Sequence, residues 1–472
     1  MDKKNALSVI SLLLVTSVTS CSHGDPNMTT IASTYEVLIP TISESLILPE
    51  VSEETSSNTE ETSDSNAPET SETDLYSDDN SFFIEAMQKY YEYNFMFNDE
   101  LTWSYDEGSK TLKISGNGPM REYSSTIPGW LRSYSETIEV VEIEEGVTSV
   151  GSFAFCELTN LRTVKLPSSC ECICDSAFEN CNYLSQINFD SGLKYIGKDS
   201  FKDCSIQNSY LMFSEGMEYI AEGAFNGGLE GIKTIGIPST VYYIGSNAFG
   251  NAQIQSITVS EDNKYYCVLD NVLYSKSMTT LLLVSNYRDY GDFVIPEEVT
   301  HIVSGAFNLT SGMKTITFPL GITEIEEEAF AFTSNIEEFI MPEENEHFFV
   351  ENGLLCSVDT KTTLAYVSAF YKTSLVIPDG IERIGSRTFT NNDELYAVYL
   401  PDSLISIGEK AFFYTGLSSL SLPSSILSIE GYSFYGASFE EITYSGTPEE
   451  WEQIDIASEG NDVINCARIV YQ

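Results

Sequence analysis

The stretch Leu395–Phe412, LYAVYLPDSLISIGEKAF, is one copy of a repeat that fills most of the chain. Its clearest mark is the final phenylalanine, which follows Ala or Ser in most copies. This phenylalanine recurs every 22 to 24 residues in seven of nine steps, and the other two steps are 58 and 59 residues. A fixed period of this length is typical of a solenoid, in which each repeat forms one coil stacked on the next. The ten phenylalanines are Phe155, Phe178, Phe201, Phe225, Phe249, Phe307, Phe330, Phe389, Phe412 and Phe434.

Two further columns accompany the phenylalanine. The residue five positions earlier is Val or Ile in all ten copies, and the residue eight positions earlier is a small to medium apolar one. Between successive phenylalanines lies a stretch of alternating apolar residues that often ends in Pro, such as LRTVKLP at 161–167. Such alternation predicts a short strand with one buried face. We therefore expect a repeat solenoid whose core is built from these columns, with parallel strand ladders.

The order of these positions, roughly L-x-x-I-x-L-P-x-x-L-x-x-I-G-x-x-A-F-x-x-C, resembles the BspA-type leucine-rich repeat family over about residues 100–445. The resemblance implies a β-rich leucine-rich repeat with short helical turns and ten coils in residues 141–445. It also implies an N-terminal cap at 81–140 and a C-terminal cap at 446–472. Caps are needed because the terminal coils of a solenoid would otherwise expose an apolar face.

The charge balance excludes some functions. The chain has 23 Lys plus Arg against 71 Asp plus Glu, for a net charge of -48. Nucleic-acid binders use clustered Lys and Arg, so this composition argues against that class. Only 3 His are present, although His is the side chain used most often for acid–base work near neutral pH. We expect neither enzymatic activity nor a cofactor, and no motif of a nucleophile elbow, phosphate loop or zinc protease is found.

The first eighty residues have the features of an export signal followed by a tether. Two lysines precede the apolar run Ala6–Val18, which predicts a signal peptide at 1–20. The next residues, Val18-Thr19-Ser20-Cys21, resemble a bacterial lipobox. This resemblance implies that Cys21 is lipidated and anchors the protein to a membrane. An ordinary cleaved signal with a chance cysteine is the alternative. Residues 21–80 are acidic and rich in Ser and Thr, which predicts a disordered tether.

Two steps of the repeat contain about 35 extra residues each, near 261–292 and 343–374. The two inserts share an acidic start, paired aromatic residues, a D-N or N-G turn and a Thr-Thr-Leu. These features predict hairpin-containing excursions from the coil. They serve either as structural padding or as recognition loops.

The cysteines give one motif, C-x-C-x-C at Cys170, Cys172 and Cys174. In isolation this would be a metal-site candidate. The repeat places the three residues in an apolar column, an outward column and a position that is often Gly in other copies, so we expect no metal site. Cys181 and Cys204 lie in a column of small residues and are either free buried thiols or a disulfide between neighbouring coils.

One outward column has a distinct composition. Six residues before the phenylalanine, three consecutive coils carry Tyr195, Tyr219 and Tyr243, and the next carries His301. Because neighbouring strands lie about 4.8 Å apart, the rings should stack into an aromatic ladder on an outer face. The ladder serves either as cross-strand stabilisation or as a binding strip.

Together these features predict a lipid-anchored protein of a bacterial cell surface. The family resemblance implies protein–protein interaction or adhesion, with an extracellular protein of a host or neighbouring cell as partner. A structural spacer and a glycan-binding protein are the alternatives. We expect no nucleic-acid partner, and contact with a membrane only through the lipid anchor.

Overall fold

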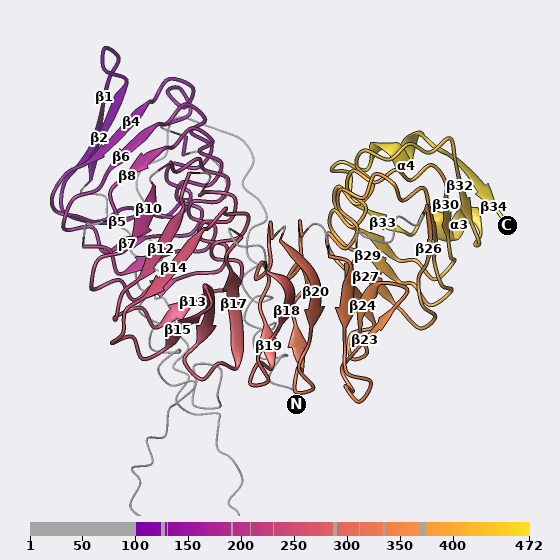
Figure 1. Ribbon diagram of the computed structural model, residues 1–472. Helices are drawn as coiled ribbons and strands as arrows, with labels where there is room; N and C mark the ends of the chain where they lie inside the picture. The colour runs from indigo at the N-terminus through magenta and orange to yellow at the C-terminus, as the bar shows by residue number, and fades with distance from the viewer. Residues whose placement is uncertain are drawn as a thin grey trace, which may run out of the picture. The chain divides into compact units, whose positions relative to one another are not determined.

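The computed structural model describes residues 101–123, 128–129, 131–189, 192–207, 209–229, 231–286, 290–310, 312–333, 336–367 and 373–472. They form a β-solenoid of about 14 turns with very little helix (Figure 1). This confirms the predicted repeat solenoid with parallel strand ladders. The predicted signal peptide, Cys21 and the acidic tether lie outside the described residues.

Each regular coil contributes two short strands, and the first strands of neighbouring coils pair in parallel within five separate sheets. The chain enters this column through an antiparallel hairpin of β1 and β2, and β2 then pairs in parallel with β4. The strands of this column are β1 (Thr102–Asp106), β2 (Thr111–Ser115), β4 (Val140–Ile143), β6 (Thr163–Lys165), β8 (Gln186–Ile187), β10 (Tyr210–Met212), β12 (Thr234–Ile237), β14 (Ser256–Val259), β18 (Gly291–Val294), β20 (Met313–Thr317), β22 (Glu338–Ile340), β26 (Ser374–Val376), β28 (Ala397–Tyr399), β30 (Leu420–Leu422), β32 (Glu441–Tyr444) and β34 (Arg468–Tyr471).

The second strands contain the invariant Val or Ile and form three sheets, because each insert starts a new one. The first of these sheets contains β3 (Gly118–Pro119), β5 (Val147–Val150), β7 (Cys172–Ile173), β9 (Tyr195–Ile196), β11 (Tyr219–Ile220) and β13 (Tyr243–Ile244). The next contains β15 (Tyr266–Leu269), β16 (Val272–Ser275), β17 (Thr280–Val284), β19 (His301–Ile302) and β21 (Glu324–Ile325). The last contains β23 (Phe348–Glu351), β24 (Leu354–Ser357), β25 (Thr362–Tyr366), β27 (Arg383–Ile384), β29 (Ser406–Ile407), β31 (Ser428–Ile429) and β33 (Asp455–Ile456).

The C-terminal residues extend both columns. β33 pairs with β31, and β34 pairs with β32. Two short helices lie among them, α3 (Pro448–Trp451) and α4 (Asp462–Cys466), and α3 begins at a capping box between Thr447 and Glu450. The cap boundaries at 81–140 and 446–472 stay predictions.

The phenylalanine column forms the centre of the core. All ten rings are at most 5% exposed, and rings of neighbouring coils stack nearly parallel. Their centroids lie 5.2 Å apart for Phe201 and Phe225, and 5.0 Å apart for Phe389 and Phe412, with interplanar angles of 7° and 8°. The Val or Ile column is buried as well, at 6% exposure or less. The columns read from the sequence are therefore the core of the solenoid.

The turn around each phenylalanine is itself a ladder. Phe155 and the residues two positions before and after it, Phe153 and Glu157, donate their N–H groups to carbonyls of the next coil at 2.8 to 3.0 Å. Phe153 and Glu157 have positive φ angles of 56° and 58°, and the corresponding residues of every phenylalanine-marked coil also have positive φ. The left-handed conformation turns alternate N–H groups along the solenoid axis. Non-glycine residues adopt this conformation at a cost, which the backbone bonds between coils offset.

Both inserts contain the predicted hairpins. β15 and β16 pair antiparallel, β16 pairs antiparallel with β17, and β17 then pairs in parallel with β19. β23, β24 and β25 repeat this pattern before β27. The inserts differ from the expected excursions because β16, β17 and β24 are buried along their whole length. They form part of the core, and β25 and β17 take the place of a second strand.

One asparagine fixes the start of each insert. The side chain of Asn263 is 1% exposed. Its Nδ2 donates to two carbonyls of the preceding coil at 2.7 and 3.0 Å, and its Oδ1 accepts from the N–H groups of Tyr265 and Tyr266 at 2.8 Å. Asn345 makes the same four bonds at the second insert. Each amide thus satisfies four backbone groups at the point where the regular ladder stops.

Replacing Asn263 by alanine should lower the free energy of unfolding by about 2 to 5 kcal/mol, because buried backbone groups lose their partners. Urea denaturation followed by circular dichroism would measure this loss. Asn286→Ala is the matched control, since the Asn286 side chain donates to the Ala252 carbonyl. Equal losses in the two variants would contradict the role given to Asn263.

The exposed Glu157 tests the cost of the left-handed turn residues. Glu157→Asn should raise the free energy of unfolding by about 0.5 to 1 kcal/mol relative to Glu157→Gln, because Asn adopts positive φ more readily than Gln. Both variants remove the same charge, so their difference in urea denaturation isolates the backbone effect. If the two variants are equally stable, the turn carries no such cost.

Candidate functional site

The predicted tyrosine ladder forms in the expected register. Tyr195, Tyr219 and Tyr243 pair directly across β9, β11 and β13. The rings of Tyr219 and Tyr243 are stacked, with centroids 4.6 Å apart at 16°, whereas those of Tyr195 and Tyr219 lie 6.5 Å apart at 46°. The repeat therefore predicted correctly which side chains are neighbours.

The expected exposure of this strip is wrong. Tyr195 is 2% exposed and Tyr219 is 4% exposed. They belong to a buried apolar cluster that is separate from the solenoid core and also contains Cys172, Cys174 and Tyr242. The Tyr195 hydroxyl donates to Glu218 Oε2 at 2.9 Å, and burial raises the pKa of Tyr243 to about 12. The column pattern shows that these rings point away from the core, but it does not show that they are buried.

His301 does not continue the tyrosine ladder. It lies on β19, in a different sheet from β13, because β15, β16 and β17 come between them. Its Nε2 lies 2.9 Å from Glu326 Oε1, and Glu326 also accepts from the Ser304 N–H and the Ser246 hydroxyl. The sequence placed His301 next to Tyr243, but the strand that pairs with β19 is β17 of the insert, where Thr280 lies opposite His301.

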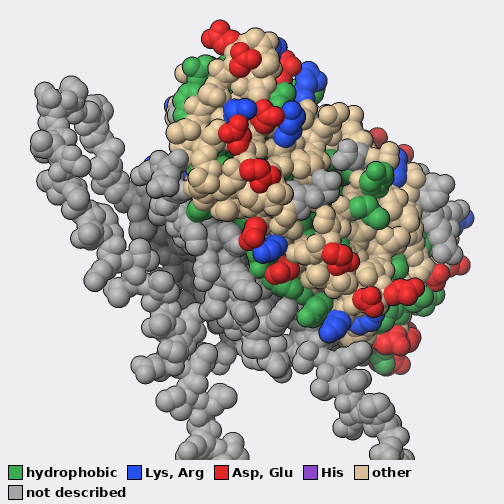
Figure 2. All heavy atoms as spheres, turned by 90° about the vertical axis from the view of Figure 1, so that its left-hand side faces the viewer, with side chains coloured by type: hydrophobic (Ala, Val, Ile, Leu, Met, Phe, Trp, Pro, Cys, Tyr) green, Lys and Arg blue, Asp and Glu red, His purple; other side chains and the backbone are tan. Residues whose placement is uncertain are grey.

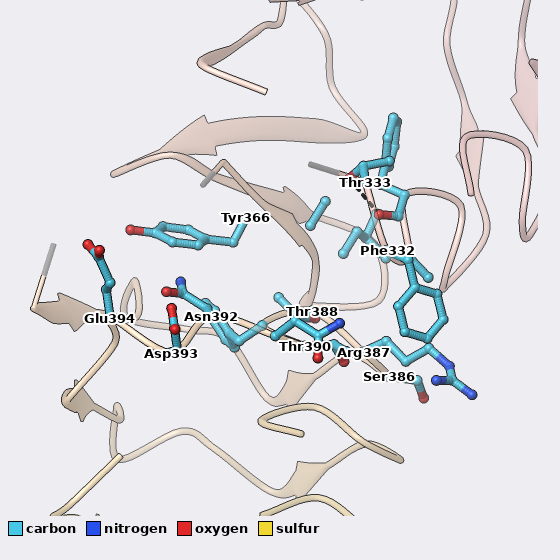
Figure 3. A pocket seen from close by; sticks show the side chains of 16 residues that line it. Phe332, Thr333, Tyr366, Ser386, Arg387, Thr388, Thr390, Asn392, Asp393 and Glu394 are labelled. Carbon is cyan, nitrogen blue, oxygen red and sulfur yellow. Dashed lines mark hydrogen bonds between the residues drawn. The ribbon is translucent and has the colours of Figure 1, made fainter. Parts of the chain in front are cut away.

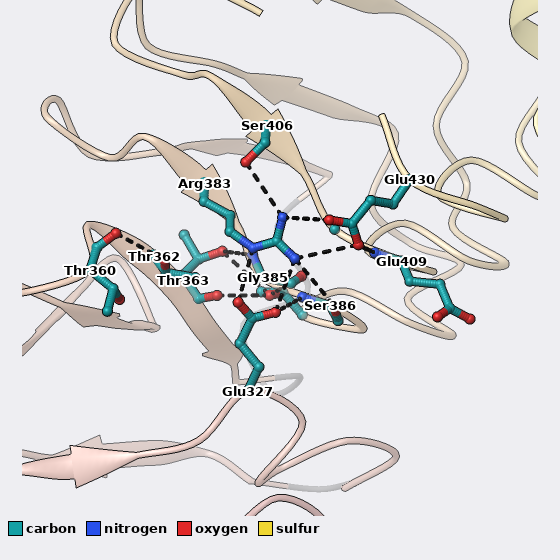
Figure 4. Close-up of polar contacts among 12 residues, drawn as sticks. Glu327, Thr360, Thr362, Thr363, Arg383, Gly385, Ser386, Ser406, Glu409 and Glu430 are labelled. Carbon is teal, nitrogen blue, oxygen red and sulfur yellow. Dashed lines mark hydrogen bonds and ion pairs between the residues drawn. The ribbon is translucent and has the colours of Figure 1, made fainter. Parts of the chain in front are cut away.

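A polar cluster centred on Arg383 connects the coils on either side of the second insert (Figure 4). The Arg383 Nε donates to Glu327 Oε1 at 2.9 Å, and its Nη1 donates to Glu430 Oε1 at 2.8 Å. Glu327 Oε2 also accepts from the Ser386 N–H at 2.9 Å. The guanidinium group therefore bridges carboxylates that are 103 positions apart in the sequence, from Glu327 to Glu430.

This arrangement shifts the acid–base equilibria of the cluster. Burial alone would raise the pKa of Glu327, but hydrogen bonds from Arg383 and the Ser386 N–H outweigh it, and the pKa lies below its usual value. Although burial opposes the charge of Arg383, its bonds to Glu327 and Glu430 raise its pKa. Glu327 and Arg383 are thus held in their charged forms at neutral pH, which suits a structural bridge more than proton transfer.

A cavity of about 210 Å³ lies beside this bridge (Figure 3). Tyr366, Asn392 and Glu394 lie at one end of it, and Phe332 and Arg387 lie at the other. Arg387 stacks on the Phe332 ring at 5.0 Å and forms an ion pair with Glu328 at 3.2 Å. The guanidinium group of Arg387 therefore already has partners, and the exposed Asn391, Asp393 and Glu394 leave the cavity open to solvent.

The cysteines among the described residues are free thiols. The Cys181 and Cys204 thiols donate to the carbonyls of Phe155 and Phe178 at 3.1 and 3.2 Å, so of the two alternatives the structure has free buried thiols. Cys172 and Cys174 approach to 3.8 Å between sulfur atoms. In the described part of the chain, no group of three or more His, Cys, Asp or Glu could hold a metal ion.

The repeat model described as the BspA type leucine-rich repeat region matches residues 133–255, 207–292, 266–356, 285–375 and 363–455. These overlapping matches cover well over half of the 472 residues. The chain belongs to the BspA-type leucine-rich repeat family. Among curated proteins nothing matches it, and within the described ranges no helix is long and apolar enough to span a membrane.

Three solved structures are among those similar to this chain. A leucine-rich repeat protein from Eubacterium ventriosum is 23% identical, with a TM-score of 0.47 over 72% of this chain and 93% of that one. A leucine-rich cell surface protein from Faecalibacterium prausnitzii is 22% identical, with a TM-score of 0.41 over 77% and 98%. The pneumococcal vaccine antigen PcpA is 16% identical, with a TM-score of 0.36 over 80% and 98%.

The BspA-type coils expose large apolar side chains on a face that the sequence did not single out. These residues occupy outward positions of the first strands, where Val376 pairs with Tyr399 across β26 and β28. Val294, Tyr210 and Tyr399 are 64%, 62% and 61% exposed. The view of Figure 2, from one side, also shows separate hydrophobic patches among interspersed acidic and basic side chains. We define the first-strand face by Tyr210, Met212, Val294, Ile340, Val376 and Tyr399.

The Arg383 bridge predicts a specific pH dependence for this BspA-type chain. Arg383→Gln should lower the free energy of unfolding by about 1 to 2 kcal/mol at pH 7, a value reduced for partial solvent exposure. The pKa of Glu327 is lowered in the folded state, so the bridge stabilises above the usual pKa of 4.5 and the stabilisation is lost as pH falls below it. The difference between the variant and the parent chain should therefore shrink in urea denaturation at pH 3.5.

Lys361→Gln is the matched control, because it removes the ion pair between Lys361 and Glu382, which is more exposed than the pair between Arg383 and Glu327. This variant should change the free energy of unfolding by about 0.5 kcal/mol or less at either pH. A difference for Arg383→Gln that stays constant from pH 7 to pH 3.5 would contradict the charged bridge.

Proposed function

We propose that this chain is a bacterial cell-surface protein, lipid-anchored through Cys21, that binds extracellular proteins through the first-strand face. The observation that carries this proposal is the exposure of six large apolar side chains on outward strand positions. Exposed apolar patches on a rigid scaffold mark interaction surfaces, and Val376 and Tyr399 are direct neighbours in such a patch. Tyrosine in particular supplies contact area at a low cost in side-chain entropy.

The N-terminal sequence supports the surface location. The apolar run Ala6–Val18 after two lysines has the pattern of an export signal, and Cys21 stands where a lipobox cysteine is modified. An acidic tether at 21–80 would repel itself and extend, which lifts the solenoid from the membrane. The repeat family and the scarcity of His both favour binding without catalysis.

The proposal is tested by immobilising the chain from residue 21 and measuring saturable binding of purified extracellular-matrix proteins and mucin at physiological salt. Val376→Ser with Tyr399→Ser should weaken the binding at least tenfold, because these two neighbours form one apolar patch. The matched control is Tyr414→Ser with Leu427→Ser. This pair is similarly exposed, at 51% and 63%, and lies outside the first strands; it should change the affinity less than twofold.

Other results lead to different functions. Binding that free polysaccharide competes away would indicate glycan capture instead of protein recognition. Equal loss in both double variants would show that the first-strand face is not the site. If no tested protein or polysaccharide binds saturably, the spacer function is favoured over adhesion.

A further inference from the structure

The solvent-open cavity at the second insert contains polar side chains that the fold itself does not use. It lies where β25 meets residues 330–333 of the coil before and residues 386–394 of the coil after. Asn392, Asp393 and Glu394 line it, and none of these three side chains forms a hydrogen bond or ion pair with any residue that the structure describes. Their amide and carboxylate groups are therefore available to a bound molecule.

The size of this cavity suits a single ring. A cavity of about 150 Å³ in a protein core admits benzene, so the 210 Å³ found here has room for a six-membered ring with its substituents. Ligands of drug size occupy larger pockets, of roughly 300 to 1,000 Å³. A longer ligand would thus place one ring in the cavity and the rest outside it.

The chemistry of the lining indicates which kind of ring. At one end the Tyr366 ring lies beside the Asn392 amide and the Glu394 carboxylate (Figure 3). A pyranose has an apolar C–H face that packs on an aromatic ring, and hydroxyl groups that both donate and accept. An amide offers a donor and an acceptor, and a carboxylate accepts from hydroxyls. The carboxylates of Asp393 and Glu394 repel an acidic sugar, which leaves a neutral one.

The mouth of the cavity continues onto exposed aromatic residues of the next coil. The Gly416 N–H donates to the Asn392 carbonyl at 3.3 Å, so Tyr414, two residues earlier, lies close to the mouth. Tyr414 and Tyr435 are 51% and 42% exposed, and their ring centroids lie 5.5 Å apart. Exposed tyrosines supply contact area at a low cost in side-chain entropy. They can therefore support a second sugar ring.

We propose that this cavity binds the terminal ring of a neutral oligosaccharide, with the next ring against Tyr414. We call Tyr366, Asn392, Glu394 and Tyr414 the sugar site. It shares no residue with the first-strand face, so sugar binding is a second activity that does not depend on protein binding there. The chain would then hold a neutral polysaccharide and a protein at different places on one solenoid.

Isothermal titration calorimetry of the chain from residue 21 tests the sugar site, with maltose, cellobiose, lactose and chitobiose as probes. At least one of these neutral disaccharides should bind saturably. Asn392→Ala with Glu394→Ala should weaken that binding about tenfold or more, because the sugar hydroxyls lose their partners. Saturable binding by none of the four disaccharides would overturn the proposal.

The matched control is Asp402→Ala with Gln453→Ala, which also removes one carboxylate and one amide. Both side chains are exposed and neither lines the cavity. This variant should change the affinity for the disaccharide less than about twofold. An equal loss in both double variants would contradict the sugar site.

Two further measurements exclude other occupants and other places. Affinity for a neutral sugar should stay constant as the salt concentration rises, since no ion pair forms. Binding that salt weakens, or that butylammonium competes away, would identify a cation site and contradict the proposal. Val376→Ser with Tyr399→Ser should leave the disaccharide affinity unchanged. If this variant removes it, the sugar binds on the first-strand face instead.

Photolabelling keeps the test independent of folding defects in the variants. A diazirine derivative of the disaccharide that binds is photolysed with the parent chain, and the labelled peptides are identified by mass spectrometry. Labels should fall within residues 386–394 and 413–416 or on Tyr366. Labelling that is confined to other residues would contradict the sugar site.

Discussion

The spacing between coils is the constraint on which the rest of this structure depends. Parallel strands repeat at about 4.8 Å, so every column that runs through the coils must tolerate a neighbour of its own kind at that distance. The phenylalanine rings meet this requirement by stacking at 4.7 to 5.9 Å within each continuous run of coils. The left-handed residues beside each ring follow from the same constraint, because they align backbone N–H groups along the axis. The spacing between neighbouring coils thus determines how the core rings stack, how the strands pair and which backbone conformation the turns adopt.

The inserts show how this constraint is relaxed without breaking the solenoid. At the first insert the turn ladder continues, since the Asn247 N–H donates to the Ser304 carbonyl at 2.9 Å although 57 residues separate them. At the second insert, side chains cross the junction, and Arg383 binds Glu327. The apolar core also divides there, because Leu355 packs into one cluster while Leu354 and Cys356 pack into the other. A strand buried on both faces therefore joins two stretches of regular coils.

The sequence predicted the inward columns and the register because both repeat, and each copy supports the interpretation of the others. It predicted the insert hairpins but not their burial, since β16 and β24 carry apolar residues on both faces and have no second copy nearby to align with. The predicted exposure of the tyrosine ladder was wrong for a different reason. A repeat shows where Tyr195 points, but it does not show how exposed the ring is. The prediction that His301 continues the tyrosine ladder was wrong because the 58-residue step contains β15, β16 and β17, which cannot be recognised from the phenylalanine positions alone.

The outward sides of the first and second strands differ in how much apolar surface they expose. With a net charge of -48, the chain repels acidic protein and glycan surfaces within about a Debye length, roughly 8 Å at physiological salt. Affinity for such surfaces must then come from short-range apolar contact rather than from electrostatic steering. The first-strand face exposes side chains that supply this contact, whereas Tyr195 and Tyr219 on the second strands are buried. These tyrosine rings contribute to the stability of the coils, and the proposed recognition surface is the face whose apolar side chains are exposed.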